Sequence, residues 1–248
     1  MALAATVSGA ARAQAGDPPA PERAISLHAA AGLGVGTLAF TLPTAQGVQR
    51  LPDTPFPAVE LALRVHAVPR ARLSLETLLA YQSSLGLELL LEPQFSLPER
   101  VDVRAHRLEL SFAPVLRLFA SNGDVALAFP IGFAFRAFVP ESHQYPTLGV
   151  HAFGGPQLRT ELWLKLGELV RLRIGPEVQW IVLVDGAMRG EGACCQGLAV
   201  GGQGVLEASV GPVFRVAFAY RESRTFVPVV SRFEGVERFL TARIAGEL

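Results

Sequence analysis

The sequence predicts an all-β fold, an antiparallel up-and-down transmembrane β-barrel of about ten strands. Apolar residues alternate with small or charged residues through most of the chain, which is the period of a β-strand. The connections between these runs are alternately short and long, a pattern typical of membrane barrels. No amphipathic helix remains to cover the apolar face, so we expect lipid to cover it. A sheet in lipid must be closed, because open edges would leave backbone groups unpaired.

The composition is consistent with this fold and excludes one class of partner. The chain has 248 residues, of which 50% are hydrophobic and 18% charged, with a mean hydropathy of +0.34. These values are apolar for a soluble protein. The formal net charge is zero, which argues against a nucleic-acid partner held by phosphate contacts. No motif indicates a cofactor, and we expect a monomer in a lipid bilayer.

The N-terminus has some features of an export signal. Residues 1–15 form a possible but incomplete signal peptide, in which Ala13-Gln14-Ala15 fits a cleavage site but a basic segment is missing. The alternatives are a start further upstream or an alanine-rich tail. Residues 16–23 contain three prolines and are expected to be an irregular lead-in, and residues 24–248 to form the barrel.

The first predicted strand, residues 25–38, could be mistaken for a membrane-spanning helix because it carries no charge. Gly32, Gly34 and Gly36 occupy alternate positions, and each glycine would destabilise a helix interior. The period of two therefore indicates a strand. Residues 41–56, which follow it, are expected to be a loop.

The run Asp124 to Val139 shows the pattern most clearly. Its odd positions are all apolar, whereas its even positions are mostly glycine or alanine, with Arg136 among them. Ser121-Asn122-Gly123 before it is a tight-turn signal. Residues 71–91 keep one parity for too long to span a bilayer, so this strand either projects from the membrane or breaks at Gln82-Ser83-Ser84. The predicted strands are 25–38, 58–67, 71–91, 104–119, 124–139, 147–166, 170–182, 198–210, 214–221 and 240–244.

In its strand pattern and its alternation of turns and loops, the chain resembles the small outer-membrane β-barrel proteins of Gram-negative bacteria. The resemblance covers about residues 24–248 and involves no diagnostic motif. The chain departs from many members at its last residues, Ala245-Gly246-Glu247-Leu248, where an aromatic residue is usual. The resemblance implies an outer-membrane location, periplasmic termini and exposed loops.

Many charged residues fall on the small-residue face and are expected to point into the lumen. One interpretation is a structural lattice of paired charges, since buried charges are tolerated only when paired. The other is a polar path for a small solute with a mild preference for anions, because arginines outnumber acids. The predicted lumen charges are Glu60, Arg64, Arg72, Glu76, Arg107, Glu109, Arg117, Arg136, Arg159, Glu161, Arg171, Arg173, Glu177, Glu207, Arg215, Arg221 and Arg243.

Histidines and cysteines are the other candidates for chemistry. His28 and His66 are expected near the periplasmic end and His106, His143 and His151 near the outer end, without a metal-binding or nucleophile motif. Cys194 and Cys195 lie in a glycine-rich loop. Adjacent cysteines could form a strained vicinal disulfide, bind a soft metal, or have no catalytic role.

The sequence thus favours an outer-membrane barrel that is structural or surface-exposed, or that forms a narrow pore for small solutes. We do not expect an enzyme. The alternatives are an outer-membrane enzyme that acts on lipid or peptide at the barrel rim, and a soluble lipocalin-like barrel that binds a ligand.

Overall fold

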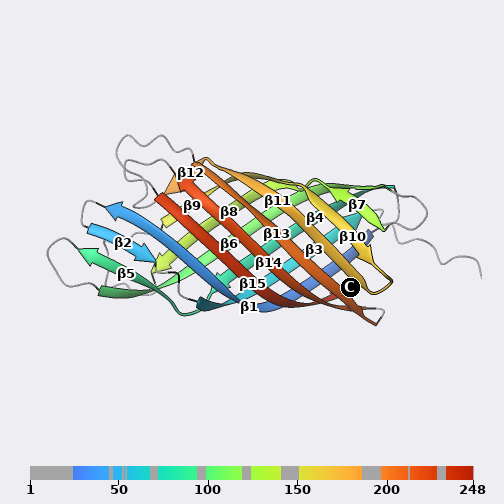
Figure 1. Cartoon of the computed structure of the whole chain (residues 1–248), viewed down its shortest axis with the longest axis horizontal. Coiled ribbons are helices and arrows are strands. Elements are labelled where there is room, and N and C mark those ends of the chain that lie inside the picture. Colours follow the sequence, from blue (N-terminus) through green and yellow to red (C-terminus); the bar gives the residue numbers. More distant parts are fainter. Residues whose placement is uncertain are drawn as a thin grey trace, which may run out of the picture.

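The computed structural model describes residues 25–44, 47–51, 53, 55–67, 72–93, 99–118, 124–140, 151–185, 197–211, 213–227 and 233–247. Their regular structure is entirely β-strand (Figure 1). None of the described residues forms a helix long and apolar enough to cross a membrane. The possible signal peptide, the lead-in, Cys194 and Cys195 lie outside the described residues.

Fifteen strand segments form the ten strands of a closed barrel. Short interruptions divide single barrel strands into β7 and β8, β9 and β10, and β11 and β12, while β2 and β5 extend β3 and β4. The segments are β1 (Ile25–Thr44), β2 (Gly47–Leu51), β3 (Pro55–Ala67), β4 (Leu73–Ser84), β5 (Leu87–Pro93), β6 (Glu99–Arg117), β7 (Val125–Ala128), β8 (Ile131–Pro140), β9 (His151–Arg159), β10 (Glu161–Leu166), β11 (Val170–Ile181), β12 (Leu183–Asp185), β13 (Gly197–Val210), β14 (Phe214–Val227) and β15 (Phe233–Glu247).

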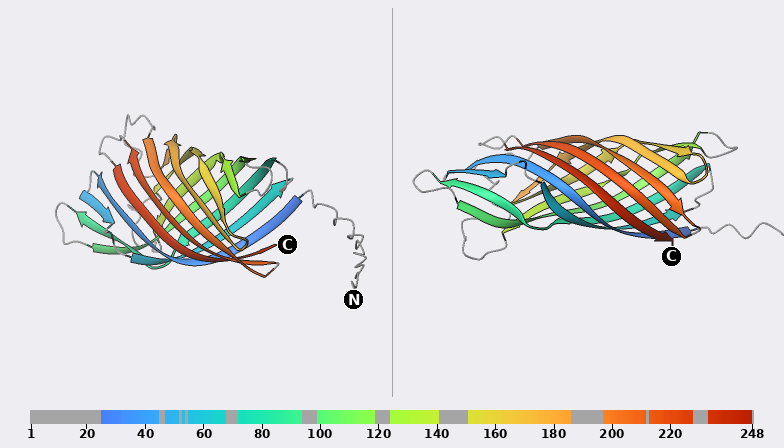
Figure 2. Two further views of the ribbon diagram at one scale, coloured as in Figure 1. Left: turned by 45° about the vertical axis from the view of Figure 1, so that its right-hand side comes forward. Right: turned by 60° about the horizontal axis from the view of Figure 1, so that its bottom comes forward.

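The barrel closes where its first and last strands meet. Neighbouring strands along the chain pair antiparallel, and β1 pairs with β15 from His28 opposite Glu247 to Thr41 opposite Glu234 (Figure 2). The wall therefore has no open edge within the membrane. The prediction of an all-β, antiparallel, roughly ten-stranded barrel is confirmed.

The two ends of the barrel differ, and we name them by their connections. The turn end carries residues 68–72, 118–124, 167–169 and 211–213, and the loop end carries 141–150, 186–196 and 228–232. Gly167 and Gly211 have φ of 78° and 83°, which favours glycine in these tight turns. The connection 228–232 is shorter than predicted, because β14 and β15 continue beyond their expected limits.

Beyond the loop end, one side of the wall extends further than the rest. Here β1, β2, β5 and β6 pair with one another past the ends of β3 and β4 (Figure 1). The prediction of a loop over 41–56 is therefore wrong in part, because this pairing holds the segment in β1 and β2. The long predicted strand 71–91 breaks at Leu85-Gly86, where Gly86 has a φ of 66°.

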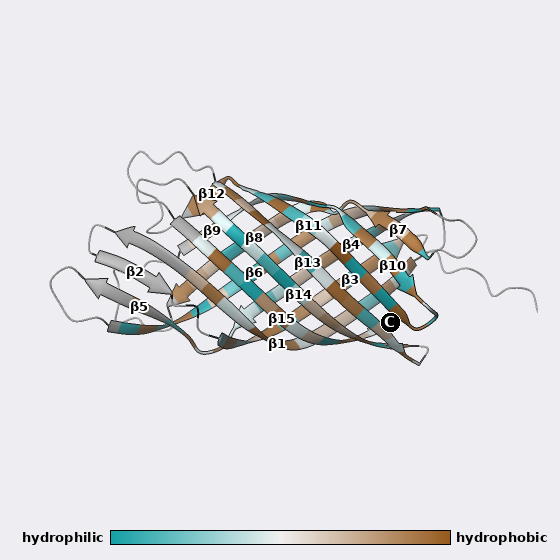
Figure 3. Cartoon of the chain, viewed as in Figure 1, coloured by the Kyte–Doolittle hydropathy of each residue, from teal (hydrophilic) through white to brown (hydrophobic). Residues whose placement is uncertain are grey.

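The two faces of the wall have the predicted chemistry. Leu33, Phe112 and Ile131 point outward and are 70%, 51% and 57% exposed, whereas the inward Glu109 is only 3% exposed. Hydrophobic and hydrophilic residues alternate along the strands (Figure 3). A soluble barrel would not expose so continuous an apolar belt to water, so the lipocalin-like alternative is excluded. The belt is the surface that a bilayer covers.

Candidate functional site

The lumen is crossed at mid-height by a group of paired charges, which we call the central ion network. It comprises equal numbers of acids and arginines, contributed by strands all around the barrel. Its members are Glu60, Arg107, Glu109, Arg136, Arg159, Glu161, Glu177, Arg221, Glu237 and Arg243. A cavity of about 60 Å³ remains within it, room for a few water molecules.

Glu109 on β6 is the centre of this network. Its carboxylate contacts three guanidinium groups: that of Arg159, that of Arg221 at 3.1 Å and that of Arg107 at 3.3 Å. Arg221 also donates from Nε to Glu177 Oε1 at 3.0 Å. Five side chains from the four strands β6, β9, β11 and β14 are thereby joined to one another across the lumen.

Towards the loop end, Arg136 on β8 connects to the opposite wall. Its guanidinium lies 2.8 Å from Glu237 on β15 and donates to Ser223 Oγ at 2.9 Å and to Gln179 Oε1 at 3.3 Å. Glu237 is not among the predicted lumen charges, because the last strand was predicted to begin at residue 240. Glu237, Phe239 and Thr241 occupy every second position, and this period of two, continued back from the predicted strand, would have placed Glu237 in the lumen.

The glycines of β1 allow its two neighbours to contact each other. Gly32 pairs with both Glu60 on β3 and Arg243 on β15, and the Arg243–Glu60 ion pair of 2.8 Å passes over it. A Cβ at Gly32 would lie 2.9 Å from Arg243 Cγ. Similarly, Phe56 and Phe239 meet edge to face over Gly36 with ring centroids 5.7 Å apart. Side chains of β3 and β15 therefore occupy the space over Gly32 and Gly36.

Above the network, towards the loop end, buried apolar side chains from strands around the barrel pack against one another in the lumen. We call this group the apolar layer; it includes Phe138 and Phe153, whose ring centroids are 6.2 Å apart. Arg136 lies 5.5 Å from the Phe153 ring centroid, which links the layer to the network. The buried members are Leu38, Phe56, Ala58, Leu87, Val101, Val103, Phe138, Phe153, Ile181, Val184, Ala199, Val227 and Phe239.

A second group of charges lies between the network and the turn end. Arg173 contacts Glu76 at 3.3 Å and Glu207 at 3.6 Å, and its Cζ lies 4.3 Å from the ring centroid of Trp163. Trp163 in turn donates from Nε1 to Glu161 Oε2 at 2.9 Å. These contacts connect the turn-end group to the central ion network.

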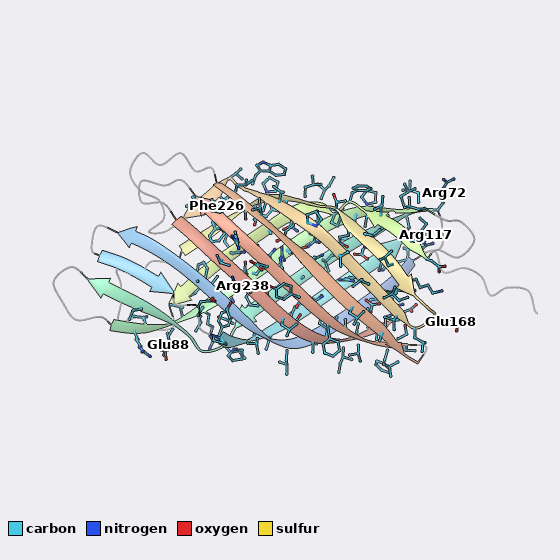
Figure 4. The ribbon with its side chains drawn as sticks, in the orientation of Figure 1. Arg72, Glu88, Arg117, Glu168, Phe226 and Arg238 are labelled. Carbon is cyan, nitrogen blue, oxygen red and sulfur yellow. The ribbon has the colours of Figure 1, made fainter. Side chains whose placement is uncertain are left out.

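The predicted lumen charges differ in their exposure. Arg72 precedes β4 and is exposed, so it lies at the turn-end rim and not among the buried charges (Figure 4). Arg171 is also exposed. The half-buried residues are Arg64, Arg117, Arg215, Arg221 and Arg243. The buried residues are Glu60, Glu76, Arg107, Glu109, Arg136, Arg159, Glu161, Arg173, Glu177 and Glu207.

The histidines are dispersed between the two ends. At the turn end, His28 and His66 meet edge to face at 5.3 Å, and His66 Nε2 lies 3.1 Å from Glu76. Towards the loop end, His106 accepts or donates a hydrogen bond of 2.8 Å to Tyr81. His143 and the side chain of His151 lie outside the described part of the chain. Within that part, no three His, Cys, Asp or Glu residues form a group that could hold a metal ion.

Comparison with known proteins identifies the fold. No family model matches the sequence, and no curated protein matches it. The structure is similar to that of the outer-membrane protease OmpT from Escherichia coli, with a TM-score of 0.52 and 12% identity over 90% of this chain and 97% of OmpT. The chain has the fold of a small outer-membrane β-barrel. The translocator domain of the autotransporter NalP from Neisseria meningitidis also matches, with a TM-score of 0.48 and 9% identity over 89% of this chain and 88% of that domain.

The predicted outer-membrane β-barrel is therefore confirmed as a fold. The similarity to OmpT reaches only 12% identity, so it carries information about the fold and not about proteolysis. The interior of this barrel has three successive groups of side chains. An apolar layer, a charge-balanced network and a turn-end group follow one another along the lumen.

Proposed function

We propose that this protein is a structural, surface-exposed outer-membrane barrel with a closed lumen, and that it is not an enzyme. The observation that carries the proposal is the filling of the lumen at two heights. The apolar layer seals the loop end, and the central ion network fills the middle. An ion crossing the barrel would have to pass an apolar constriction and then displace charges that are already paired.

The extended wall at the loop end supports a role at the cell surface. The pairing of β1, β2, β5 and β6 carries ordered backbone beyond the rest of the barrel. Its outward side chains include Glu88 and Arg100, which form an exposed ion pair of 3.1 Å. A projection with an exposed ion pair on its outer face suits contact with water or with another molecule at the surface.

Conductance tests the closed lumen directly. We expect purified wild-type protein in a planar bilayer to give no stable current, because the apolar layer and the network block the path. Heat-modifiable migration on gels would establish that the same sample is folded. A small anion-preferring current would favour the alternative, a narrow pore for small solutes. A large cation-selective current would contradict both the packing and the charge arguments.

Orientation is a separate prediction. We expect the turn end to face the periplasm and the loop end to face outside, as the resemblance to outer-membrane barrels implies. An epitope tag at residues 121–124 should be shielded on intact cells, whereas a tag within 185–197 should be labelled. Labelling only at 121–124 would invert the orientation, and labelling at both sites would contradict a spanning barrel.

The positions of the histidines support a non-catalytic role. His106 is hydrogen-bonded to Tyr81 near the loop end, away from the His28 and His66 pair at the turn end. A rim enzyme would need a nucleophile, a base and an orienting acid at one height. Ser83 Oγ lies 3.2 Å from His106 Nδ1, but the contacts of His106 within the described part of the chain include no acidic side chain that would complete such a trio.

A further inference from the structure

The turn end of the lumen contains a cavity that has no part in closing the barrel. Its volume is about 190 Å³, larger than the space left within the central ion network. We call it the basic vestibule. It is lined by Arg117, Asp124, Ala126, Trp163, Leu164, Lys165, Arg171 and Arg173. Arg117, Asp124 and Lys165 lie at the turn-end limits of β6, β7 and β10, and Arg171 is exposed, so solvent reaches the cavity from the turn end (Figure 4).

The charge of the vestibule differs from that of the network. The network has equal numbers of acids and arginines, whereas four cationic side chains and one carboxylate, Asp124, line the vestibule. Arg173 is already paired with Glu76 and Glu207. In the described part of the chain, no acid lies within ion-pair distance of Lys165 or Arg171, and Glu207 acts on Arg171 only from further away. A concave site with an excess of cations concentrates anions.

Contacts between its side chains also hold part of the lining in place. Arg173 is buried and stacks on Trp163, whose indole is fixed by its hydrogen bond to Glu161. Arginine presents a planar fork of donors that matches carboxylate and phosphate groups. The vestibule therefore combines a floor formed by the stacked Trp163 and Arg173 with the more exposed cations Lys165 and Arg171 at its entrance.

We propose that the basic vestibule binds a small soluble oxyanion, a phosphate or carboxylate group, that enters from the turn end. The barrel wall separates the vestibule from the surrounding bilayer, so a lipid headgroup in the bilayer cannot reach it sideways. In the closed barrel proposed above, the vestibule is a blind pocket and not part of a pore. The proposal does not depend on the proposed surface role, since an open barrel could also contain this site.

Binding of inorganic phosphate to the folded protein tests this proposal. Trp163 reports on the vestibule, and a Trp180→Phe background removes the other tryptophan, which lies on the lipid side and is 47% exposed. We expect a saturable change in Trp163 emission with phosphate, and a matching heat in titration calorimetry. Sodium chloride at the same ionic strength should produce neither.

Three variants locate the site. Lys165→Gln and Arg171→Gln should each weaken phosphate binding about tenfold or more, the usual effect of losing a charge-assisted hydrogen bond. Arg72→Gln is the matched control, because Arg72 is an exposed arginine at the same end that does not line the vestibule. Wild-type affinity in both vestibule variants, equal losses in all three, or an identical response to chloride would each overturn the proposal. So would the absence of both a fluorescence change and a heat.

Discussion

Replacing Glu109 with alanine is expected to lower the free energy of unfolding by about 3–5 kcal/mol, the usual cost of removing one partner from a buried ion pair. Glu109 is 3% exposed and contacts Arg107, Arg159 and Arg221. Its loss leaves three guanidinium groups close together without the carboxylate that compensates them. Urea unfolding in liposomes, followed by gel mobility, measures the change.

Two further variants separate charge from packing. Glu109→Gln retains the size of the side chain but removes its charge, so it should destabilise the barrel nearly as much as alanine. Glu88→Ala breaks an exposed pair with Arg100, and we expect a change of about 0–1 kcal/mol. If Glu109→Ala cost no more than Glu88→Ala, the network would not stabilise the lumen.

The second large effect is expected on the lipid face. Phe133 on β8 points outward, is 38% exposed and pairs with Leu110 and Pro156 on its neighbours, near the middle of the apolar belt. Phe133→Arg would place a charge near the centre of the bilayer, at a cost of about 2–4 kcal/mol. The same unfolding measurement in liposomes detects this loss.

The control is the same substitution at an outward residue that lies at a different depth in the membrane. Phe226 also points outward and is 44% exposed, but it lies near the loop-end limit of β14, two residues from the exposed Arg224 (Figure 4). Phe226→Arg should cost only about 0–1 kcal/mol, because charges near the membrane interface retain water. Equal costs at the two positions would refute the placement of the bilayer around the barrel.

Alternation along the strands was enough to predict the barrel and to separate its two faces. In the segment from Asp124 to Val139, the predicted outward residues Phe129, Ile131 and Phe133 are exposed, and the inward Ala134 is fully buried. A period of two is a local property, so it can be read from one sequence. The interruption at Phe129-Pro130 does not change the parity.

The partners within the lumen could not be predicted in the same way. Arg221 and Glu109 are 112 positions apart, and their contact depends on how far each strand is staggered around the closed barrel. The alternation of residue types along one strand contains no information about this stagger. The apolar layer was missed for another reason: Phe56, Phe138 and Phe239 have the composition of the lipid face, and only their parity assigns them to the lumen.

The ion pair over Gly32 has a consequence for assembly. Glu60 and Arg243 are 183 positions apart, and they meet only once β15 has joined the far side of β1. Contacts between such distant segments form late, because the chain loses entropy before it gains the contact energy. Until then, an open sheet would carry both charges unpaired beside its two free edges. Joining the seam therefore removes the unpaired charges and the free edges in one step, which would make partly closed intermediates short-lived during insertion.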